Sequence, residues 1–315
     1  MNSQIILGLR NEHNDCYINA VIQCLGNFYS VRTFFNPANS RMMRFLNKNS
    51  KSNGEVSIEF SRLLEQLRKG QHDFGSKAIS KEEDLKEFPS VKALKTVVEK
   101  YHSSSFGTCQ QDAHEFLIAL LNFLHEEMKF GSTSFVKNTF EGKQASTLTC
   151  QNCGFESVKD ECFYELTLEV GDRRENVRNL SELLASYLTP EPVEWTCSKC
   201  QKRGNASKKV DIIKFPKILT IHLSRFCTVR GTEKNLTLVE FDFELNLRAY
   251  SVFGSKYQLN SICNHYGGLQ KGHYTAFIYS KQDLKWYRAD DEIVDEVHYQ
   301  DVVSNASYIL FYDQI

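Results

Sequence analysis

The chain has 315 residues, of which 41% are hydrophobic and 24% are charged, values typical of a globular protein with a substantial core. Its 38 basic and 39 acidic residues leave a net charge of −1, which excludes a whole-protein field that would attract nucleic acid or a membrane. No apolar run approaches the ~20 residues that cross a bilayer. No secretory signal is evident, and the fifteen residues before Cys16 leave no room for a targeting module. Ten cysteines without such a signal favour metal binding and catalysis over disulfides, and predict a cytoplasmic or nuclear location.

A cysteine lies at the predicted start of the first helix. Apolar residues recur after it at the i, i+3, i+4, i+7 spacing of an amphipathic helix, namely Val21, Cys24, Leu25 and Phe28. Asn14 and Asp15 precede Cys16 and are residue types that favour the N-cap position. The positive end of the helix dipole favours thiolate over thiol. Cys16 is therefore a candidate nucleophile, although a lone cysteine is more often a buried packing residue.

The first 130 or so residues are predicted to be mostly helical, with a mobile polar loop at 47–54. Within this part a helix begins after Asp112, which is well placed as its N-cap, with Glu115 three residues on in a capping-box pattern. Helix capping is the simplest interpretation, and His114 is predicted to face solvent. The alternative is a polar cluster of Gln111, Asp112 and Glu115 that receives a basic peptide.

Two Cys-x-x-Cys pairs bracket a predicted strand and a short helix; they are Cys150 with Cys153 and Cys197 with Cys200. Four thiolates at this spacing predict one closed tetrahedral site for a structural Zn²⁺ ion, and the closure argues against catalytic zinc. A redox role for one pair is the competing interpretation. Basic residues near Cys200 raise the question of nucleic-acid binding, but no aromatic residues are interleaved with them, so no direct nucleic-acid contact is expected.

The last third of the chain is predicted to be rich in strands. His273 opens one strand after a glycine-rich loop, and the next strand ends in Asp290 and Asp291. Neighbouring antiparallel strands bring the start of one beside the end of the next, so His273 and Asp290 are expected to lie close together. With Cys16 they supply the parts of a thiol-protease triad. Taken singly, His273 could be an ordinary strand histidine and the two acids an ordinary turn.

Together these stretches strongly resemble the ubiquitin-specific protease family of deubiquitinating enzymes. The matching motifs are Gly8-Leu9-x-Asn11, Asn14-x-Cys16-Tyr17-x-Asn19, Gln111 to Phe116, both cysteine pairs, His265-x-Gly267, Gly272-His273-Tyr274, Trp286-Tyr287-x2-Asp290-Asp291 and Tyr308 to Tyr312. The resemblance implies an α+β fold shaped like a papain-type hand, as a single catalytic domain over 1–315. Its parts would be a helical thumb (about 1–135), zinc-ribbon fingers (about 136–215) and an antiparallel β palm (about 216–315).

The resemblance also implies a role for each catalytic residue. Cys16 would be the nucleophile, His273 the general base and later the general acid, and Asp290 the residue that orients His273. Asn14 would stabilise the oxyanion together with the Cys16 backbone N–H. Asp291 would assist by holding Asn14 or a water molecule. The reaction would be hydrolysis of the bond after the C-terminal glycine of ubiquitin, through a thioester.

The implied partners are ubiquitin and ubiquitinated proteins. The ubiquitin tail is basic and ends in two glycines, so Asp112, beside Gln111 and Glu115, would pair with a tail arginine. Gly272 and Tyr274 would line a narrow tunnel for the glycines. Two flexible loops would roof that tunnel, namely Thr228 to Asn235 and Tyr266 to Lys271. Whether an activating protein partner is needed to order them is an open question at this point.

The nucleophile motif departs from the family pattern Gly-Asn-Thr-Cys. His13 replaces the glycine, where the backbone could need unusual dihedral angles. Asp15 and Glu12 place negative charge near Cys16, which predicts a slower nucleophile because such charge disfavours the thiolate. Two alternatives are a ubiquitin-binding pseudoenzyme that lacks activity and a protease for another ubiquitin-like modifier.

Overall fold

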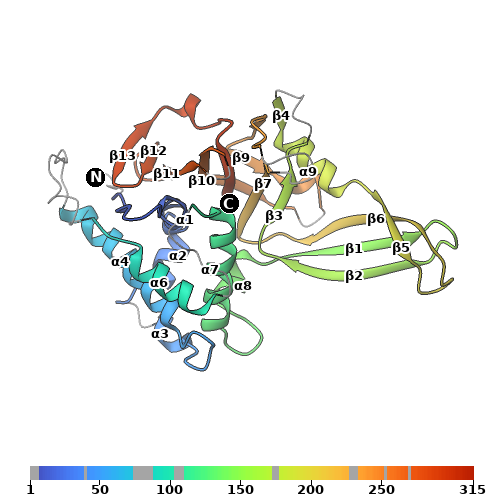
Figure 1. Ribbon diagram of the computed structural model, residues 1–315, viewed down its shortest axis with the longest axis horizontal. Coiled ribbons are helices and arrows are strands. Elements are labelled where there is room, and N and C mark those ends of the chain that lie inside the picture. Colours follow the sequence, from blue (N-terminus) through green and yellow to red (C-terminus); the bar gives the residue numbers. More distant parts are fainter. Residues whose placement is uncertain are drawn as a thin grey trace.

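The computed structural model describes residues 7–38, 41–73, 88–102, 110–171, 177–226, 233–251, 254–268 and 271–315. Most of its helices gather on one side, an eight-stranded sheet lies beside them, and a four-stranded sheet projects away from both (Figure 1). The sequence prediction of an α+β hand is confirmed by this arrangement. No helix within the described residues combines the length and apolar composition needed to cross a bilayer.

The helical part is built around α1, which is buried on every side. Each residue from Cys16 to Leu25 is buried, because α1 packs between the eight-stranded sheet and α7. The amphipathic pattern therefore predicted the helix but not its central position. The helices of this part are α1 (Cys16–Gly26), α2 (Tyr29–Phe34), α3 (Arg41–Phe45), α4 (Glu55–Asp73), α6 (Lys92–Tyr101), α7 (Ala113–Glu127) and α8 (Phe135–Phe140).

The polar stretch at 47–54, predicted to be mobile, is held by a buried carboxylate. Glu127, at the end of α7, is fully buried and accepts hydrogen bonds from Ser52 Oγ at 2.5 Å and from the backbone N–H groups of Val56 at 3.1 Å and Ser57 at 2.6 Å. These N–H groups belong to the first turn of α4, where a carboxylate also favours the helix dipole. Glu127 thereby fixes the entrance to α4.

The palm is a sheet in the order β13-β12-β11-β10-β14-β7-β3, with β9 also paired to β10. Its pairs are antiparallel except for β3 and β7, which run parallel. The strands are β3 (Leu166–Glu169), β7 (Ile218–Ser224), β9 (Glu244–Asn246), β10 (Lys256–Gly267), β11 (Gly272–Ser280), β12 (Lys285–Asp290), β13 (Ile293–Val297) and β14 (Ser307–Gln314).

The fingers form a separate antiparallel sheet in the order β2-β1-β6-β5, which extends to the right in Figure 1. Its strands are β1 (Gly142–Cys150), β2 (Glu156–Phe163), β5 (Glu191–Thr196) and β6 (Arg203–Lys214). The predicted fingers range of about 136–215 needs one correction, because β3 lies within it and joins the palm sheet. Its alternating burial leaves one face to pack in the palm core.

A small unit connects the fingers to the palm. β4 (Val177–Asn179) pairs in parallel with β8 (Leu238–Glu240), and α9 (Leu180–Leu188) follows β4 directly. A complete capping box starts α9, in which Asn179 and Glu182 bind each other's backbone N–H groups. The buried leucines of α9 pack in the same core as β3 and β7.

Candidate active site

Cys16, His273 and Asp290, here called the catalytic group, lie together in space. Cys16 is the first residue of α1 and is 2% exposed. Its thiol is hydrogen-bonded to His273, whose Nε2 lies 2.6 Å from Asp290 Oδ1. Because Nε2 faces Asp290, the other ring nitrogen is the one available to Cys16. The nucleophile–base–carboxylate order is therefore present in one connected chain of side chains.

The β11–β12 pairing explains how His273 meets Asp290. His273 is the second residue of β11, and Asp290 is the last residue of the antiparallel neighbour β12, with Ala276 opposite Ala289. Contacts between α1 and both strands set Cys16 against them. The two acids are thus close to the catalytic histidine for the geometric reason predicted from sequence.

The environment of His273 favours its protonated form. The hydrogen bond to Cys16 is the largest influence and raises the pKa of His273 to about 9; burial opposes this and Asp290 adds to it. At neutral pH the imidazole therefore carries a proton that it shares with the thiol. A protonated His273 is able to supply the proton that the leaving amine requires.

Asp291 holds two asparagines of the nucleophile segment. Its Oδ2 accepts a hydrogen bond from Asn11 Nδ2, and its Oδ1 accepts one from Asn19 Nδ2, both at 2.7 Å. Burial raises the pKa of Asp291 despite these two bonds. Asp291 thus holds Asn11 and Asn19 directly, and its predicted role in holding Asn14 or a water molecule stays a prediction. Asn11 and Asn19 were not selected as functional residues, although both belong to the motif that contains Cys16.

The unusual backbone dihedral of the nucleophile turn falls on Asn14, which has a φ of 52°. Asparagine tolerates the left-handed region better than most residues. His13 is not among the described residues with positive φ, so the concern about a side chain at that position is wrong. Gly8 is constrained instead, because a Cβ there would overlap the carbonyl oxygen of Glu292.

The two acids beside Cys16 are compensated by basic side chains. Asp15 Oδ1 accepts a hydrogen bond from Lys95 Nζ at 2.8 Å, and both side chains are nearly buried, 4% and 12% exposed. Glu12 pairs with Arg10. Lys95 thus offsets part of the negative charge that Asp15 places near Cys16, and the slower nucleophile stays a prediction.

The predicted tail-binding residues differ in exposure. Asp112 caps α7 as predicted: its Oδ1 accepts from His114 N–H and its Oδ2 from Tyr308 OH, each at 2.7 Å. Gln111 is half-buried and Glu115 is exposed in the first turn of α7. An acidic helix start thus faces solvent beside the palm.

Gly272 and Tyr274 lie next to this helix start. A Cβ on Gly272 would overlap the His265 ring, and Gly272 N–H donates to the Gln110 side chain. Tyr274 is 5% exposed, and its hydroxyl accepts a hydrogen bond from Ala113 N–H. Tyr274 is therefore largely buried and offers little surface to a substrate in this structure. Of the two predicted roofing loops, residues 228–232 and 269–270 lie outside the described residues.

His114 does not face solvent as predicted. Its Nε2 lies 2.5 Å from both carboxylate oxygens of Glu165, and its ring is stacked on that of His222 with centroids 3.8 Å apart. Burial lowers the pKa of His114, but Glu165 outweighs it and the net shift is upward. His222 is itself buried, in a strand whose other positions are buried up to Leu223, and α8 contacts this strand.

The four fingers cysteines converge at the ends of β1, β5 and β6. Cys150 and Cys200 sulfurs are 4.0 Å apart, Cys153 and Cys197 sulfurs are 3.7 Å apart, and all four lie within 4.8 Å of one another. Tetrahedral zinc thiolate sites place sulfurs about 3.8 Å apart. The backbone N–H of Lys202, and then the Asn152 side chain and the neighbouring cysteines, lower the pKa of Cys200 to about 6 against the effect of burial, so a thiolate is favoured there. The donor set fits one metal ion.

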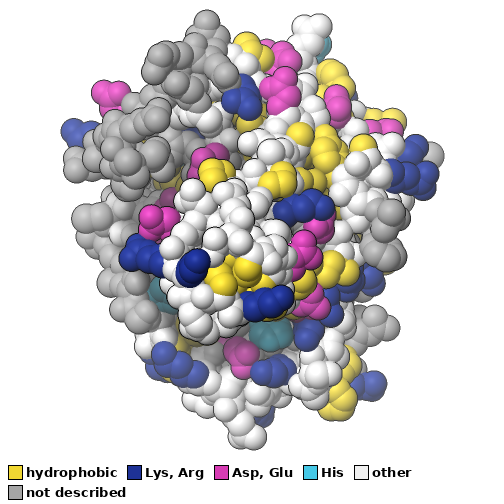
Figure 2. Space-filling view, turned by 90° about the vertical axis from the view of Figure 1, so that its right-hand side faces the viewer, with side chains coloured by type: hydrophobic (Ala, Val, Ile, Leu, Met, Phe, Trp, Pro, Cys, Tyr) yellow, Lys and Arg dark blue, Asp and Glu magenta, His cyan; other side chains and the backbone are white. Residues whose placement is uncertain are grey.

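The end of the fingers carries both signs of charge. Arg203 pairs with Glu194 at 2.7 Å, and Lys208 pairs with Glu191 at 3.1 Å. Figure 2 views the molecule from this side, and basic and acidic side chains are interspersed over it. These ion pairs break up the basic run that the sequence shows near Cys200.

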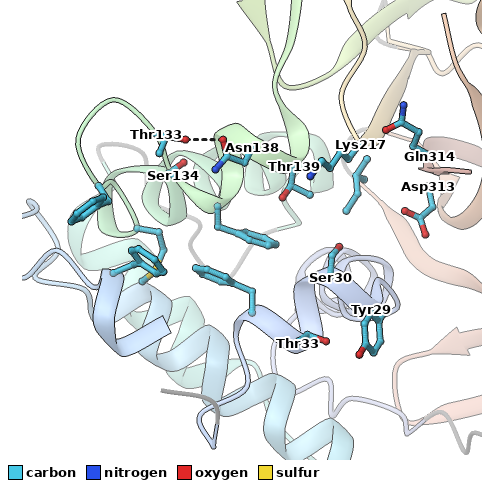
Figure 3. A pocket seen from close by; sticks show the side chains of 16 residues that line it. Tyr29, Ser30, Thr33, Thr133, Ser134, Asn138, Thr139, Lys217, Asp313 and Gln314 are labelled. Atoms are coloured by element: carbon cyan, nitrogen blue, oxygen red, sulfur yellow. Dashed lines mark hydrogen bonds between the residues drawn. The ribbon is translucent and has the colours of Figure 1, made fainter. Parts of the chain in front are cut away.

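A pocket of about 710 Å³ lies apart from the catalytic group. Stacked rings of Phe34 and Phe135, 4.2 Å apart, belong to its lining, with Thr133, Asn138 and Lys217 around it (Figure 3). The pocket is lined by residues that follow the C-terminal end of α1, whereas Cys16 is at the N-terminal end of this helix. The eleven residues of α1 span about 16 Å. The pocket is therefore not part of the catalytic centre.

The fold and the catalytic group are those of a papain-like thiol protease hand. A family model described as ubiquitin carboxyl-terminal hydrolase matches residues 7–312, so the chain belongs to that family, as the motifs predicted. The chain is 27% identical to Ubiquitin carboxyl-terminal hydrolase 2 of Rattus norvegicus over 351 residues, covering 99% of this chain and 54% of the relative. The chain thus spans about half the length of that relative.

Two further matches are consistent with this family and fold. Ubiquitin hydrolase B of Dictyostelium discoideum is 32% identical over 274 residues, covering 71% of this chain and 60% of the relative. A solved structure of the SAGA DUB module of Ubp8, Sgf11, Sus1 and Sgf73, bound to monoubiquitin, gives a TM-score of 0.80 at 23% identity, covering 100% of this chain and 70% of the matched chain. At that identity the likeness establishes the shared fold.

Proposed function

We propose that the chain is a single catalytic domain that hydrolyses the peptide or isopeptide bond after the C-terminal glycine of ubiquitin, acting on ubiquitin and ubiquitinated proteins. The observation that carries this proposal is the connected Cys16–His273–Asp290 group at the N-terminus of α1, in a chain of the ubiquitin carboxyl-terminal hydrolase family. Substrate identity comes from the family, and the chemistry from the catalytic group.

In this mechanism the Cys16 sulfur attacks the carbonyl carbon of the terminal glycine, and His273 holds the thiol proton. The developing oxyanion is stabilised by the Cys16 backbone N–H, at the start of a helix, and by the Asn14 side-chain amide. His273 then gives its proton to the leaving amine, and a thioester remains. Water, deprotonated by His273, releases the ubiquitin carboxylate and regenerates the thiol.

Asp290 orients His273 throughout and stabilises its charged form. Asp291 acts as a positioning residue, because it holds Asn11 and Asn19 on either side of the nucleophile turn. Asp112, Gln111 and Glu115 are proposed to receive the basic ubiquitin tail, with Gly272 beside the terminal glycines. Asp112 keeps acceptor capacity after its two bonds, since a carboxylate offers about four lone-pair sites.

The four fingers cysteines are proposed to hold one structural Zn²⁺. Support comes from the sulfur separations and from the matching turns after each pair, where Gly154 and Gln201 both have positive φ. The ion would fix the tips of β1 and β6 in register. It takes no part in the hydrolysis, because a closed four-thiolate site leaves no position for substrate.

A fluorogenic amide at the ubiquitin C-terminus tests the proposed reaction. Wild type is expected to release the fluorophore, while Cys16→Ser and His273→Gln lose nearly all activity, consistent with their roles as nucleophile and base. Equal rates on ubiquitin and on another ubiquitin-like modifier would contradict the proposed substrate. Binding of ubiquitin without turnover by wild type would favour the pseudoenzyme, or an enzyme that requires an activating protein partner.

A further inference from the structure

We propose that His114, His222 and Glu165 form a second metal site, separate from the fingers cysteines, that binds a divalent transition metal such as Zn²⁺. The ligand atoms of the three residues all lie within 4.8 Å of one another. They come from three elements, since His114 is in the first turn of α7, Glu165 precedes β3, and His222 is in β7. Two imidazoles and one carboxylate are a ligand set that zinc uses where one coordination position stays open.

The strongest support is a buried nitrogen that has no hydrogen-bond partner. His222 is 8% exposed, and its Nε2 is enclosed without a partner among the described residues. A neutral imidazole nitrogen that is kept from water and left unpaired is costly for the fold, unless it serves as a ligand.

Hydrogen bonds fix which nitrogen of His222 carries the proton. Thr167 Oγ1 donates to Glu165 Oε1 at 3.1 Å, so the hydroxyl proton is committed to the carboxylate. The same hydroxyl oxygen lies 3.2 Å from His222 Nδ1 and must then accept a hydrogen bond from Nδ1–H. Nε2 therefore presents a bare lone pair. Thr167 acts as an outer partner that holds both a histidine and the carboxylate, as is usual around metal ligands.

Metal binding requires a small rearrangement of His114. Its ring is now parallel to that of His222 within 9°, and its Nε2 is aimed at Glu165. A tetrahedral ion with ligand distances of about 2.0–2.1 Å holds its ligand atoms about 3.3 Å apart, so the three groups must close on one point. The side chains of His114 and Glu165 are 23% and 17% exposed, which gives an ion access from solvent and the ring room to turn.

The charges around the site favour a cation. The carboxylates of Asp112, Glu115 and Glu165 all act on His114. His222 also meets the ring of Tyr308 edge-on, with centroids 4.9 Å apart, and Tyr308 OH binds Asp112. A bound ion would therefore lie near Asp112, the proposed partner of the ubiquitin tail, because its ligand His114 is hydrogen-bonded to Asp112. Because it adds positive charge there, metal binding is expected to weaken tail binding; this coupling rests on the proposed function, whereas the metal site does not.

Cobalt absorption tests the site directly. The protein carries Cys16→Ala, which removes the active-site thiol, and one equivalent of zinc is added first to fill the fingers cysteines. Co²⁺ is then titrated and its visible absorption recorded. We expect one further Co²⁺ per chain with the spectrum of nitrogen and oxygen ligands. His114→Gln and Glu165→Gln should each abolish it, and Thr167→Val should weaken it by about 10–100-fold.

Two histidine variants are matched controls. His125→Gln alters another histidine of α7, and His273→Gln alters the only other described histidine grouped with two acids, Asp290 and Asp291. Both should keep the cobalt spectrum. Absence of a Co²⁺ bound in addition to the zinc, or a bound Co²⁺ that survives both His114→Gln and Glu165→Gln, would overturn the metal site. His222→Gln is a further ligand variant, but His222 is buried and this variant could fail to fold. The variants of His114 and Glu165, which lie nearer the surface, decide the result in that case.

The coupling is measured in the same Cys16→Ala protein as ubiquitin affinity with and without Co²⁺. We expect the dissociation constant to rise at least about 5-fold with metal, and to be unchanged by metal in the added presence of Glu165→Gln. An unchanged affinity in the cobalt-loaded protein would overturn the coupling and leave the metal site standing. Absence of ubiquitin binding in either state would contradict the proposed function, while the cobalt spectra still decide the site.

Discussion

Asp291 Oδ2 accepts a hydrogen bond from Asn11 Nδ2 at 2.7 Å, and this bond joins the end of the palm hairpin to the turn that precedes the nucleophile. Asn11 Oδ1 in turn accepts from the backbone N–H of Asp15 at 2.9 Å. The other oxygen of Asp291 binds Asn19, in α1. The strand that carries Asp290 and the helix that carries Cys16 are thus tied by one carboxylate.

Replacing Asp291 by alanine is predicted to lower both stability and turnover. Two amide groups would lose their acceptor, at about 1–3 kcal/mol of unfolding free energy for each group left buried and unpaired. The measurement is chemical unfolding together with kcat for the fluorogenic ubiquitin amide. Asp295→Ala is the control, since Asp295 is about half exposed and pairs with Arg288 on the surface. Equal effects of the two variants would refute the linking role of Asp291.

Replacing Lys95 by methionine is predicted to destabilise the fold by about 3 kcal/mol, because it leaves the buried Asp15 carboxylate without its partner. Lys92→Met is the matched control: Lys92 is on the same helix, its side chain is 70% exposed, and its nearest acid, Glu12, is 3.6 Å away. We expect a change within about 0.5 kcal/mol for that variant. Urea unfolding of both variants at neutral pH measures the difference, and similar losses would exclude a special role for the Asp15–Lys95 pair.

The pKa of His273, raised to about 9, sets the alkaline limit of activity. The imidazolium is present below that pH and is lost above it, and with it the proton for the leaving amine. We therefore predict that kcat/KM falls as pH rises through about 9. Asp290→Asn removes one contribution that raises this pKa, so the alkaline limb should move to lower pH and the rate should fall, by up to about 10⁴-fold as for a triad aspartate. An alkaline limb that is identical in Asp290→Asn would show that Asp290 does not act on His273.

Loss of a fingers cysteine is predicted to remove one zinc ion per chain and to loosen the fingers. Cys200→Ser tests this by metal analysis and by hydrogen exchange of β1 and β6, whose amides should lose protection. Cys162→Ser is the control, because Cys162 is an exposed thiol on β2 outside the cluster. The palm has its own core and should keep its protection. Unchanged zinc content in Cys200→Ser would rule out the proposed cluster.

Local sequence patterns predicted the structural features that depend on residues close together in the chain. The short helix predicted between the two cysteine pairs is α9, and the strand order around His273 predicted its meeting with Asp290. The resemblance supplied the palm and fingers.

Pairings across long stretches of chain could not be read from such patterns. Lys95 pairs with Asp15 across 80 residues, and Glu127 binds Ser52 across 75 residues and the start of α4 across 70 and 71. His114, in the first turn of α7, stacks on His222 in β7, although the two residues lie far apart in the sequence. Each of these pairs is set by packing, so residue type gives no local signal for it.

The most direct test is reaction with ubiquitin that carries a thiol-reactive group at its C-terminus, followed by intact mass measurement of wild type and Cys16→Ala. The predicted result is an adduct one ubiquitin heavier in wild type and none in Cys16→Ala, which identifies both the nucleophile and the recognised modifier. An adduct of the same extent in Cys16→Ala would contradict the role of Cys16. No adduct and no ubiquitin binding in wild type would contradict ubiquitin as the substrate.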